Sequence, residues 1–500
     1  MNKLKEVYQL SLSLLTDLYQ LTMAYGYWKS GISERESVFH LFFRNNPFNG
    51  GYTVSCGLEY VINFLEDFKF NEEDTAYLAT INAPNGTPLF EKEFLDYLLE
   101  LKFTCQVDAI PEGTVVFPHE PLIRIQGPVL QCQLLETPLL NIINFQSLIA
   151  TKASRIYLAA KGDPILEFGL RRAQGIDGAL AASRAAYIGG CSSTSNVLAG
   201  KLFGIPVNGT HAHSWVMSFE NEFEAFKTYA EALPDNCILL VDTYDTLEGV
   251  KNAIKVADIL KKKDKKIIGI RIDSGDLAYL SIKARELLDQ AGFEDAKIFA
   301  SNDLDEYLLQ SLKEQDAEIN AWGIGTKLVT AYDQPALGAV YKLSALKNKD
   351  ELWESKIKLS EQSFKINNPG KQQVRRFFQN KKFFTDMIFN ELDDHITDPF
   401  IIIDPLDPTR QKILSSNEYF YQDLLIPIFR NGNLVYEIPA LTHVKENLKH
   451  ELGFLFKGNK RFINPHTYPV GLHEKLYKEK MRLILKLRKG IKKINFNTKE

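Results

Sequence analysis

The sequence has little cysteine and no long apolar run, and each shortage excludes a class of protein. Its 500 residues include five cysteines, none of them in a Cys-x-x-Cys pair. This argues against a disulfide framework and a structural zinc site, and for a reducing compartment. No stretch approaches the ~20 apolar residues that cross a bilayer. The apolar beginning is interrupted by Glu6 and Asp17 and has no small-residue cleavage site, so we expect a cytoplasmic protein.

Net charge is also small. The formal charge is −4 at pH 7, which gives no general attraction to nucleic acid or to an anionic membrane. Residues 475–499 are the exception, because they are rich in lysine and arginine. The simpler interpretation of that stretch is a solvated helical tail, and a binding patch is the alternative. A chain of 500 residues also exceeds one ordinary core, so two or three domains are expected.

The pattern along the chain divides it into three segments. Residues 1–160 are mixed, with short Pro- and Gly-punctuated β-type runs at 105–130 and helical spacing at 135–161. Residues 161–345 alternate short apolar runs with helical patterns. Residues 346–500 lose this alternation, and we expect them to pack on the first segment.

The alternation in the middle segment predicts parallel strands joined by right-handed crossovers, in either a barrel or a doubly wound sheet. The expected strands are 164–168, 206–208, 238–241, 267–272, 297–300 and 319–323. The expected helices between them include 246–262, 276–291 and 304–314.

Polar, charged or Gly-rich residues follow each of these six strands. The stretches are FGLRR, GTHAHS, DTYDT, RIDSGD, SND and GIGT, in chain order. In α/β barrels the carboxyl ends of the strands meet on one face, and the active site lies there. The sequence therefore predicts a catalytic face at these strand ends.

The residue types on this face suit a substrate with more than one phosphate. Arg271 and Asp273 are two apart on a strand and so point to the same side. They form either a structural ion pair or a site for an anion and a sugar diol. The turn that contains Gly325 suits a phosphate, or is a simple tight turn. Asp242 is either the partner of a nearby histidine or a helix N-cap.

Two histidines, His211 and His213, lie two apart in the stretch GTHAHSW. A zinc site would need a third or fourth His or Cys, and the next histidine, His395, lies outside the middle segment. A zinc-dependent hydrolase is nevertheless kept as an alternative. For His211 the simplest interpretation is a ring hydrogen-bonded in the loop. His213 is the better candidate for nucleophilic or acid–base chemistry.

These stretches, in this order, resemble nicotinate phosphoribosyltransferases. The resemblance extends from about residue 14 to 345 and includes LLTDLYQLTMAYGYWKSG, FGLRRAQG, GTHAHSW, IRIDSGDL and WGIGTKLVTAYDQPALGAVYKL. It implies an irregular, TIM-like α/β barrel at 161–345 and an open-faced α/β sandwich built mainly from 1–160. The C-terminal region, 346–500, would pack on the sandwich. It also implies a homodimer with active sites shared between subunits.

The implied reaction joins nicotinate to 5-phosphoribosyl 1-pyrophosphate, giving nicotinate mononucleotide and pyrophosphate, as the first step of NAD salvage from nicotinic acid. ATP is a co-substrate and phosphorylates His213. Mg²⁺ or Mn²⁺ is carried by the pyrophosphate and ATP, so no metal ligand is predicted in the protein. Binding of nucleic acid or membrane is not expected.

The resemblance assigns a role to each candidate residue. The nicotinate site would contain Phe168, Thr210, Arg271 and Tyr19 of the partner subunit. The phosphoribosyl pyrophosphate site would contain Arg171, Asp273, Ser301, Asn302, Gly325 and Thr326. Our own inference from the residues is that Asp242 orients the imidazole of His213.

A second question is which pyridine the site accepts. Relatives that use nicotinamide have the same layout but place an aspartate near the pyridine, where it accepts from the amide N–H. The comparable loop here, residues 189–196 (GGCSSTSN), contains serines and no acid. This favours nicotinate over the alternative, a nicotinamide phosphoribosyltransferase.

Overall fold

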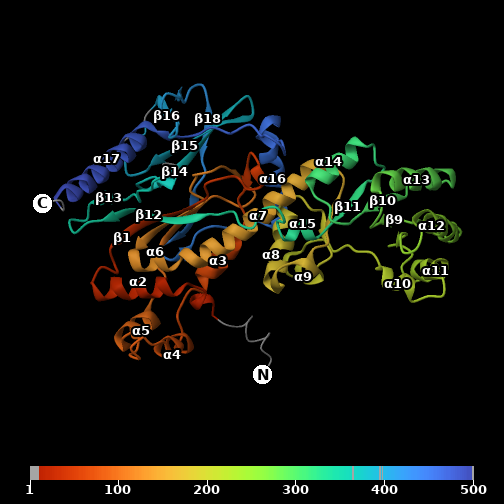
Figure 1. The fold of residues 1–500 in the computed structure, drawn as a ribbon, viewed down its shortest axis with the longest axis horizontal. Helices are drawn as coiled ribbons and strands as arrows, with labels where there is room; N and C mark the ends of the chain where they lie inside the picture. The colour runs from red at the N-terminus through yellow and green to blue at the C-terminus, as the bar shows by residue number, and fades with distance from the viewer. Residues whose placement is uncertain (1–10, 363–364, 394–395, 397, 498–500) are drawn as a thin grey trace. The chain divides into compact units, whose positions relative to one another are not determined.

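The computed structural model describes residues 11–362, 365–393, 396 and 398–497 of the chain. They form two compact units (Figure 1). Unit 1 contains Met1–Ser147, Ala336–Ala440 and His450–Glu500, and unit 2 contains Leu148–Pro335 and Leu441–Lys449. The domain boundaries predicted at residues 160 and 345 stay a prediction. His395 and the last residues of the basic tail lie outside the described residues.

Unit 1 contains a seven-stranded antiparallel sheet in the order β13-β12-β1-β5-β3-β19-β20. In that order the strands are Trp353–Ser355, Val340–Lys347, Glu36–Phe42, Ile123–Pro128, Gln106–Ala109, Ile426–Arg430 and Asn433–Leu434. The central strand β1 is apolar and buried on both faces after Glu36. Helix α6 (Val129–Leu134) packs against β1 and β5, and α2 (Leu18–Lys29) packs against α6. The antiparallel sheet predicted within residues 105–130 is therefore confirmed, because β3 pairs with β5.

A second sheet of unit 1 has the order β17-β16-β21-β15-β14-β18. Its strands, in that order, are Gln411–Leu414, Phe400–Ile403, Val470–His473, Lys382–Asn390, Gln372–Gln379 and Phe420–Asp423. A short pair joins β2 (Thr53–Val54) to β4 (Val115–Val116). The unit also contains α3 (Leu58–Glu66), α4 (Glu72–Ala79) and α5 (Lys92–Glu100). The basic tail forms the predicted helix, α17 (Glu474–Asn497), but it is not a wholly solvated one, because it packs against β15, β16 and β21 (Figure 1).

Unit 2 is built on a six-stranded parallel sheet in the order β7-β6-β11-β10-β9-β8, which curls into part of a barrel. In that order the strands are Ser193–Thr194, Ile165–Glu167, Ala321–Ile324, Lys297–Ala300, Gly269–Ile272 and Ile238–Leu240. The helices of the unit, apart from α7, are α8 (Gly175–Ile188), α9 (Val197–Phe203), α10 (His213–Met217), α11 (Glu222–Ala232), α12 (Thr246–Lys261), α13 (Leu277–Gln290), α14 (Glu306–Glu314) and α15 (Thr326–Val329). Strands and helices alternate as the sequence predicts, and the α/β class is confirmed.

The long helix predicted at 135–161 is α7 (Glu136–Ala160), which continues from unit 1 into unit 2. Helix α16 (Leu441–Phe454) contributes its first two turns, Leu441–Lys449, to unit 2.

One predicted strand of unit 2 is wrong. Of residues 206–208, only Val207 pairs, in an isolated parallel bridge to Thr194. The physical reason is that Pro206 has no N–H to donate and the run is too short to form a ladder. The sequence analysis also missed β7, whose two residues are polar and show no alternation.

Aspartates at the strand ends explain why the helices begin where they do. The side chains of Asp245, Asp276 and Asp305 accept backbone N–H groups in the first turns of α12, α13 and α14. Such N-caps satisfy donors that have no partner within the helix. Helix α12 is therefore capped by Asp245, so the N-cap interpretation of Asp242 is wrong.

All five cysteines are free and buried. Among the described residues, no helix is both long and apolar enough to cross a membrane.

Candidate active site

The predicted residues of unit 2 gather at the carboxyl ends of its parallel strands. Phe168 follows β6, Asp242 follows β8 and Ser301 follows β10. Arg271 lies within β9, and Asp273 comes directly after it. Neighbouring parallel strands end at the same edge of a sheet, which brings these side chains together.

Arg271 is the centre of this group. Its Nε donates to Ser301 Oγ at 2.8 Å, and its Nη1 donates to Thr210 Oγ1 at 2.8 Å. Its Nη2 donates to Asp273 Oδ1 at 2.9 Å. The guanidinium carbon lies 5.5 Å from the centre of the Phe168 ring, within the range of a cation–π interaction. The arginine therefore stands beside an aromatic face with every nitrogen oriented by a short polar side chain.

Asp273 connects the arginine to His213. Its Oδ1 accepts from Arg271 and from the hydroxyl of Ser301, and its Oδ2 lies 3.8 Å from His213 Nε2. Burial acts to raise the pKa of Asp273, but the hydrogen bond from Ser301 and the charge of Arg271 outweigh it. The pKa of this carboxyl is therefore below its ordinary value, and the group is a carboxylate at neutral pH.

His213 begins helix α10 and is accessible to a ligand. Its side chain is 39% exposed, and its Nδ1 lies 3.2 Å from Thr243 Oγ1. At 3.8 Å the separation of Nε2 from Asp273 is too long for a hydrogen bond. One ring nitrogen thus faces a neighbouring hydroxyl and the other faces the site.

His211 has a different environment, although it is only two residues away. The backbone N–H of Leu240 donates to its Nε2 at 3.1 Å, and its Nδ1 lies 3.3 Å from the Ala212 carbonyl. This arrangement requires the proton on Nδ1. Burial lowers the pKa of His211 to about 4, so the ring is neutral. The predicted hydrogen-bonded ring is what the structure contains.

The contacts of His211 count against the zinc alternative. A zinc ligand must offer a free nitrogen lone pair, but Nε2 accepts from Leu240 and Nδ1 carries the proton. In the part of the chain that the structure describes, no three His, Cys, Asp or Glu side chains are grouped to hold a metal ion.

Asp242 makes contacts that the sequence analysis did not predict. Its Oδ2 accepts from the backbone N–H of Asp273 at 2.8 Å and from Ser274 Oγ at 2.6 Å. Asp242 therefore fixes the turn that carries Asp273. The contact to the imidazole Nδ1 of His213 comes from Thr243, the next residue.

The two predicted phosphate-binding stretches form tight turns. Gly325 precedes α15, which begins at Thr326. Asn302 follows Ser301 with φ of +97°, a left-handed conformation that is uncommon outside glycine. Both turns lie at the carboxyl ends of β10 and β11, and backbone N–H groups in turns of this kind can bind an anion.

Gly323, on β11, is a residue that the sequence analysis did not assign to the site. A Cβ atom at Gly323 would lie 2.6 Å from Cε2 of Phe168. The absence of a side chain therefore sets how close the aromatic ring lies to the sheet.

Two of the predicted site residues, Arg171 and Tyr19, take no part in the contacts described above. Arg171 is exposed in the short 3-10 helix Leu170–Arg172, three residues after Phe168. Tyr19 is on α2 of unit 1, where 48% of its surface is exposed. Their predicted roles stay predictions.

Glu167 is a further residue that the sequence analysis missed. It is the last residue of β6 and is 1% exposed. Its carboxylate accepts from Ser183 Oγ at 2.8 Å and from Thr194 Oγ1 at 2.5 Å. The sequence feature that could have identified it is an acidic residue at the end of an apolar strand, because a buried charge there requires several hydrogen-bond donors.

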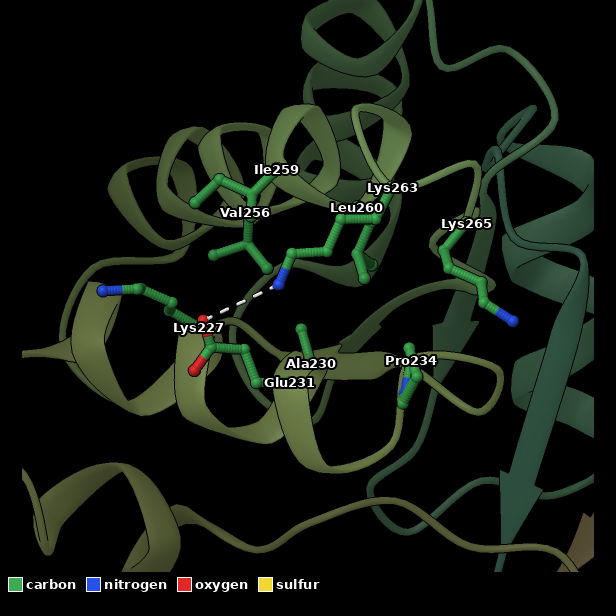
Figure 2. A pocket seen from close by; sticks show the side chains of 9 residues that line it. All are labelled: Lys227, Ala230, Glu231, Pro234, Val256, Ile259, Leu260, Lys263 and Lys265. Atoms are coloured by element: carbon green, nitrogen blue, oxygen red, sulfur yellow. Dashed lines mark ion pairs between the residues drawn. The ribbon is translucent and has the colours of Figure 1, made fainter.

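A separate pocket of unit 2 lies away from these residues, between α11 and α12 (Figure 2). It encloses about 140 Å³ and is lined mainly by apolar side chains such as Val256 and Leu260. Its rim lysines Lys263 and Lys265 lie 3.9 and 2.7 Å from acidic partners.

The chain matches family models along most of its length. The model of the nicotinate phosphoribosyltransferase N-terminal domain matches residues 14–144, the family model matches 164–382, and the C-terminal domain model matches 371–480.

Full-length relatives agree with these matches. A nicotinate phosphoribosyltransferase of Bacillus subtilis is 45% identical over 485 residues, which covers 96% of this chain and 97% of the relative. One of Caenorhabditis elegans is 38% identical over 526 residues, covering 93% and 92%.

Solved structures agree as well. The crystal structure of human nicotinic acid phosphoribosyltransferase superposes with a TM-score of 0.82 at 31% identity, and covers 94% of this chain and 99% of that chain. Nicotinate-nucleotide pyrophosphorylase from Pyrococcus furiosus, at 23% identity and a TM-score of 0.67, shares the fold. This chain is therefore a member of the nicotinate phosphoribosyltransferase family.

Proposed function

We propose that the protein transfers the phosphoribosyl group of 5-phosphoribosyl 1-pyrophosphate to nicotinate, giving nicotinate mononucleotide and pyrophosphate. The observation that carries the proposal is the arrangement of Arg271 beside Phe168. A ring that stacks on Phe168 would place its carboxylate within reach of a guanidinium whose planar fork matches carboxylate geometry. Membership of the family supports the same reaction.

The carboxylate of the substrate takes over contacts that Arg271 now makes within the site. At present the Nη1 of Arg271 donates to the hydroxyl of Thr210, a residue that is partly exposed. The comparable loop at 189–196 supplies hydroxyls and no acid. A carboxylate there would repel nicotinate, whereas it would accept the amide N–H of nicotinamide, so nicotinate is the preferred pyridine.

The remaining residues suit the sugar phosphate. We assign Asp273 to the ribose hydroxyls, because its lowered pKa keeps it an acceptor. The turns at Ser301–Asn302 and Gly325–Thr326 offer N–H and hydroxyl donors to phosphate oxygens. Arg171, exposed near Phe168, is assigned to the departing pyrophosphate.

The donor set fits a divalent cation that arrives with the substrate. In the described part of the chain there is no cluster of three ligands for a resident ion, and Mg²⁺ usually combines one or two carboxylates with substrate phosphates. Mg²⁺ or Mn²⁺ bound to the pyrophosphate and to ATP would neutralise their charge. The carboxylates of this site, Asp242 and Asp273, both already accept hydrogen bonds from protein groups, so we assign no metal ligand to the protein.

We assign the coupling to ATP to His213. Its Nε2 faces the site and its ring is 39% exposed, so a phosphoryl group could reach it. Thr243 contacts Nδ1 and holds the ring in that orientation. Hydrolysis of the phosphohistidine would then drive a synthesis that is otherwise unfavourable.

We also propose a cytoplasmic homodimer. Five free cysteines fit a reducing compartment. On α9, Val197, Leu198 and Leu202 are exposed apolar side chains, which together mark an interaction surface. A second copy of the chain is the partner that the family resemblance suggests, with Tyr19 of the partner subunit completing the pyridine site.

The test is product formation from phosphoribosyl pyrophosphate and Mg²⁺, with nicotinate or nicotinamide, in the presence and absence of ATP, while ADP release is followed. We expect nicotinate to be used and ATP to stimulate its turnover. The variant His213→Asn should lose ADP release and stimulation but retain ATP-independent turnover. The matched change His443→Asn, at an exposed position on α16, should leave both intact.

Three results would contradict the proposal or a part of it. Preferential use of nicotinamide would reject the assignment of the pyridine, and no turnover of either pyridine would reject the reaction. ADP release by His213→Asn at the wild-type rate would reject the phosphohistidine.

A further inference from the structure

Glu167 connects three elements beneath the proposed pyridine site. It is the last residue of β6, and its carboxylate accepts from the N–H of Gly169, from Ser183 Oγ on α8 at 2.8 Å and from Thr194 Oγ1 on β7 at 2.5 Å. The side chain is 1% exposed. The carboxylate thus replaces water with three protein donors, each from a different part of the chain.

The first of these hydrogen bonds fixes the turn that carries the aromatic ring. Phe168 is between Glu167 and Gly169, and its own N–H donates to the Ile324 carbonyl at 2.7 Å. A Cβ at Gly169 would lie 2.2 Å from Cγ1 of Val329, so the turn packs directly against α15. The backbone on both sides of Phe168 is therefore held, which leaves the ring little freedom to shift.

The other two hydrogen bonds fix the serine-rich loop. Thr194 Oγ1 also accepts from the N–H of Asn196 at 2.9 Å, and Ser195 N–H donates to the Glu167 carbonyl at 2.9 Å. Asn196 Nδ2 donates to Ser183 Oγ at 3.2 Å. One residue, Glu167, thus determines the position of the loop and of the aromatic turn through its side chain and its main chain.

We propose that Glu167 is a positioning residue for the pyridine substrate: its carboxylate sets the spacing between the Phe168 ring and the 193–196 loop. It acts through these residues and does not touch the substrate. The inference rests on the proposed function, because it takes Phe168 as the stacking face for nicotinate. Its consequence is that loss of the carboxylate weakens the binding of the pyridine and leaves in place the turn after β10, which shares none of these contacts.

The test is Glu167→Gln, which keeps the size of the side chain but removes its charge and replaces one of its two accepting oxygens by an NH₂ group. We expect the KM for nicotinate to rise about tenfold, as for the loss of one hydrogen bond to a charged group, and the KM for phosphoribosyl pyrophosphate to rise clearly less, because the turn after β10 keeps its contacts. Glu167→Asp, which keeps the charge, should recover part of the affinity. Thr194→Val removes one donor without a change of size and should reproduce part of the defect.

The control is Asp163→Asn, the same chemical change two residues before β6, where Asp163 accepts from Trp322 Nε1 at 2.9 Å. It should leave both KM values unchanged. Thermal unfolding of each variant identifies loss of folding, and if Glu167→Gln does not fold, Thr194→Val and Ser183→Ala test the same network.

Three outcomes would overturn the inference. In the first, the KM for nicotinate is unchanged in folded Glu167→Gln, or in the two substitute variants. In the second, both KM values and kcat change by the same factor, which would mark a structural role alone. In the third, wild-type enzyme does not use nicotinate, and this outcome rejects the proposed function as well.

Discussion

Replacement of Arg271 by lysine tests the centre of the proposed site. Lysine keeps the positive charge but loses the planar fork, so it cannot pair with a carboxylate through two parallel hydrogen bonds. The structure gives the guanidinium three oriented donors, to Ser301 at 2.8 Å, Thr210 at 2.8 Å and Asp273 at 2.9 Å. A single ammonium cannot satisfy these partners and the substrate together.

The magnitude follows from the number of hydrogen bonds lost. If lysine retains one charge-assisted hydrogen bond to nicotinate where arginine makes two, the loss is roughly 1.5–3 kcal/mol. Because about 1.4 kcal/mol corresponds to a factor of ten, kcat/KM for nicotinate should fall about 10- to 150-fold.

The assay is the initial rate as a function of nicotinate at saturating phosphoribosyl pyrophosphate, Mg²⁺ and ATP. Arg285→Lys is the matched control, because that guanidinium pairs with Asp289 within α13. A value of kcat/KM for nicotinate within twofold of the wild type would refute the placement of Arg271 against the carboxylate. If only the KM for phosphoribosyl pyrophosphate rises, Arg271 belongs to the sugar-phosphate part of the site and not to the pyridine part.

Two further changes test neighbouring features. Gly323→Ala would place a Cβ 2.6 Å from Cε2 of Phe168, whose backbone is held on both sides, so we expect a higher KM for nicotinate together with a lower melting temperature; an unchanged KM would mean that the ring does not hold the substrate. Burial keeps the pKa of His211 at about 4, below the ~6.5 of an unfolded chain, so its contribution to stability is complete above pH 6.5 and is lost as the pH falls toward 4. The loss amounts to about 3 kcal/mol. Urea unfolding measures the free energy of unfolding at pH 7 and at pH 4.5. The decrease between the two pH values should be smaller for His211→Gln than for the wild type, and an equal decrease would show that this ring does not titrate in that way.

The fold was predictable where the local pattern was strong. The helix expected at 246–262 is α12 (Thr246–Lys261), because apolar residues recur at helical spacing and Asp245 caps its first turn. Strand β10 (Lys297–Ala300) has the bounds predicted for it. In contrast, the two polar residues of β7 form a strand only because β6 lies beside them, and a single sequence contains no such information.

The sequence allowed us to predict which strand ends form the site, but not the hydrogen bonds that connect its side chains. The rule that strand ends converge brought Arg271, Asp273 and Ser301 together, as the hydrogen bonds among them confirm. The sequence did not indicate which oxygen each donor selects. Thr243 therefore contacts His213 where Asp242 was expected, and Glu167 was overlooked because two of its three donors, Ser183 and Thr194, come from distant parts of the chain.

The hydrogen bond from Leu240 to His211 has a consequence for solubility. Strand β8 is at one edge of the parallel sheet, and such an edge offers unpaired N–H groups to the strands of other molecules. The ring nitrogen occupies one of these donors, so a side chain blocks strand addition at that point. Protonation of the ring in acid would free the Leu240 N–H and remove this block at the edge formed by β8.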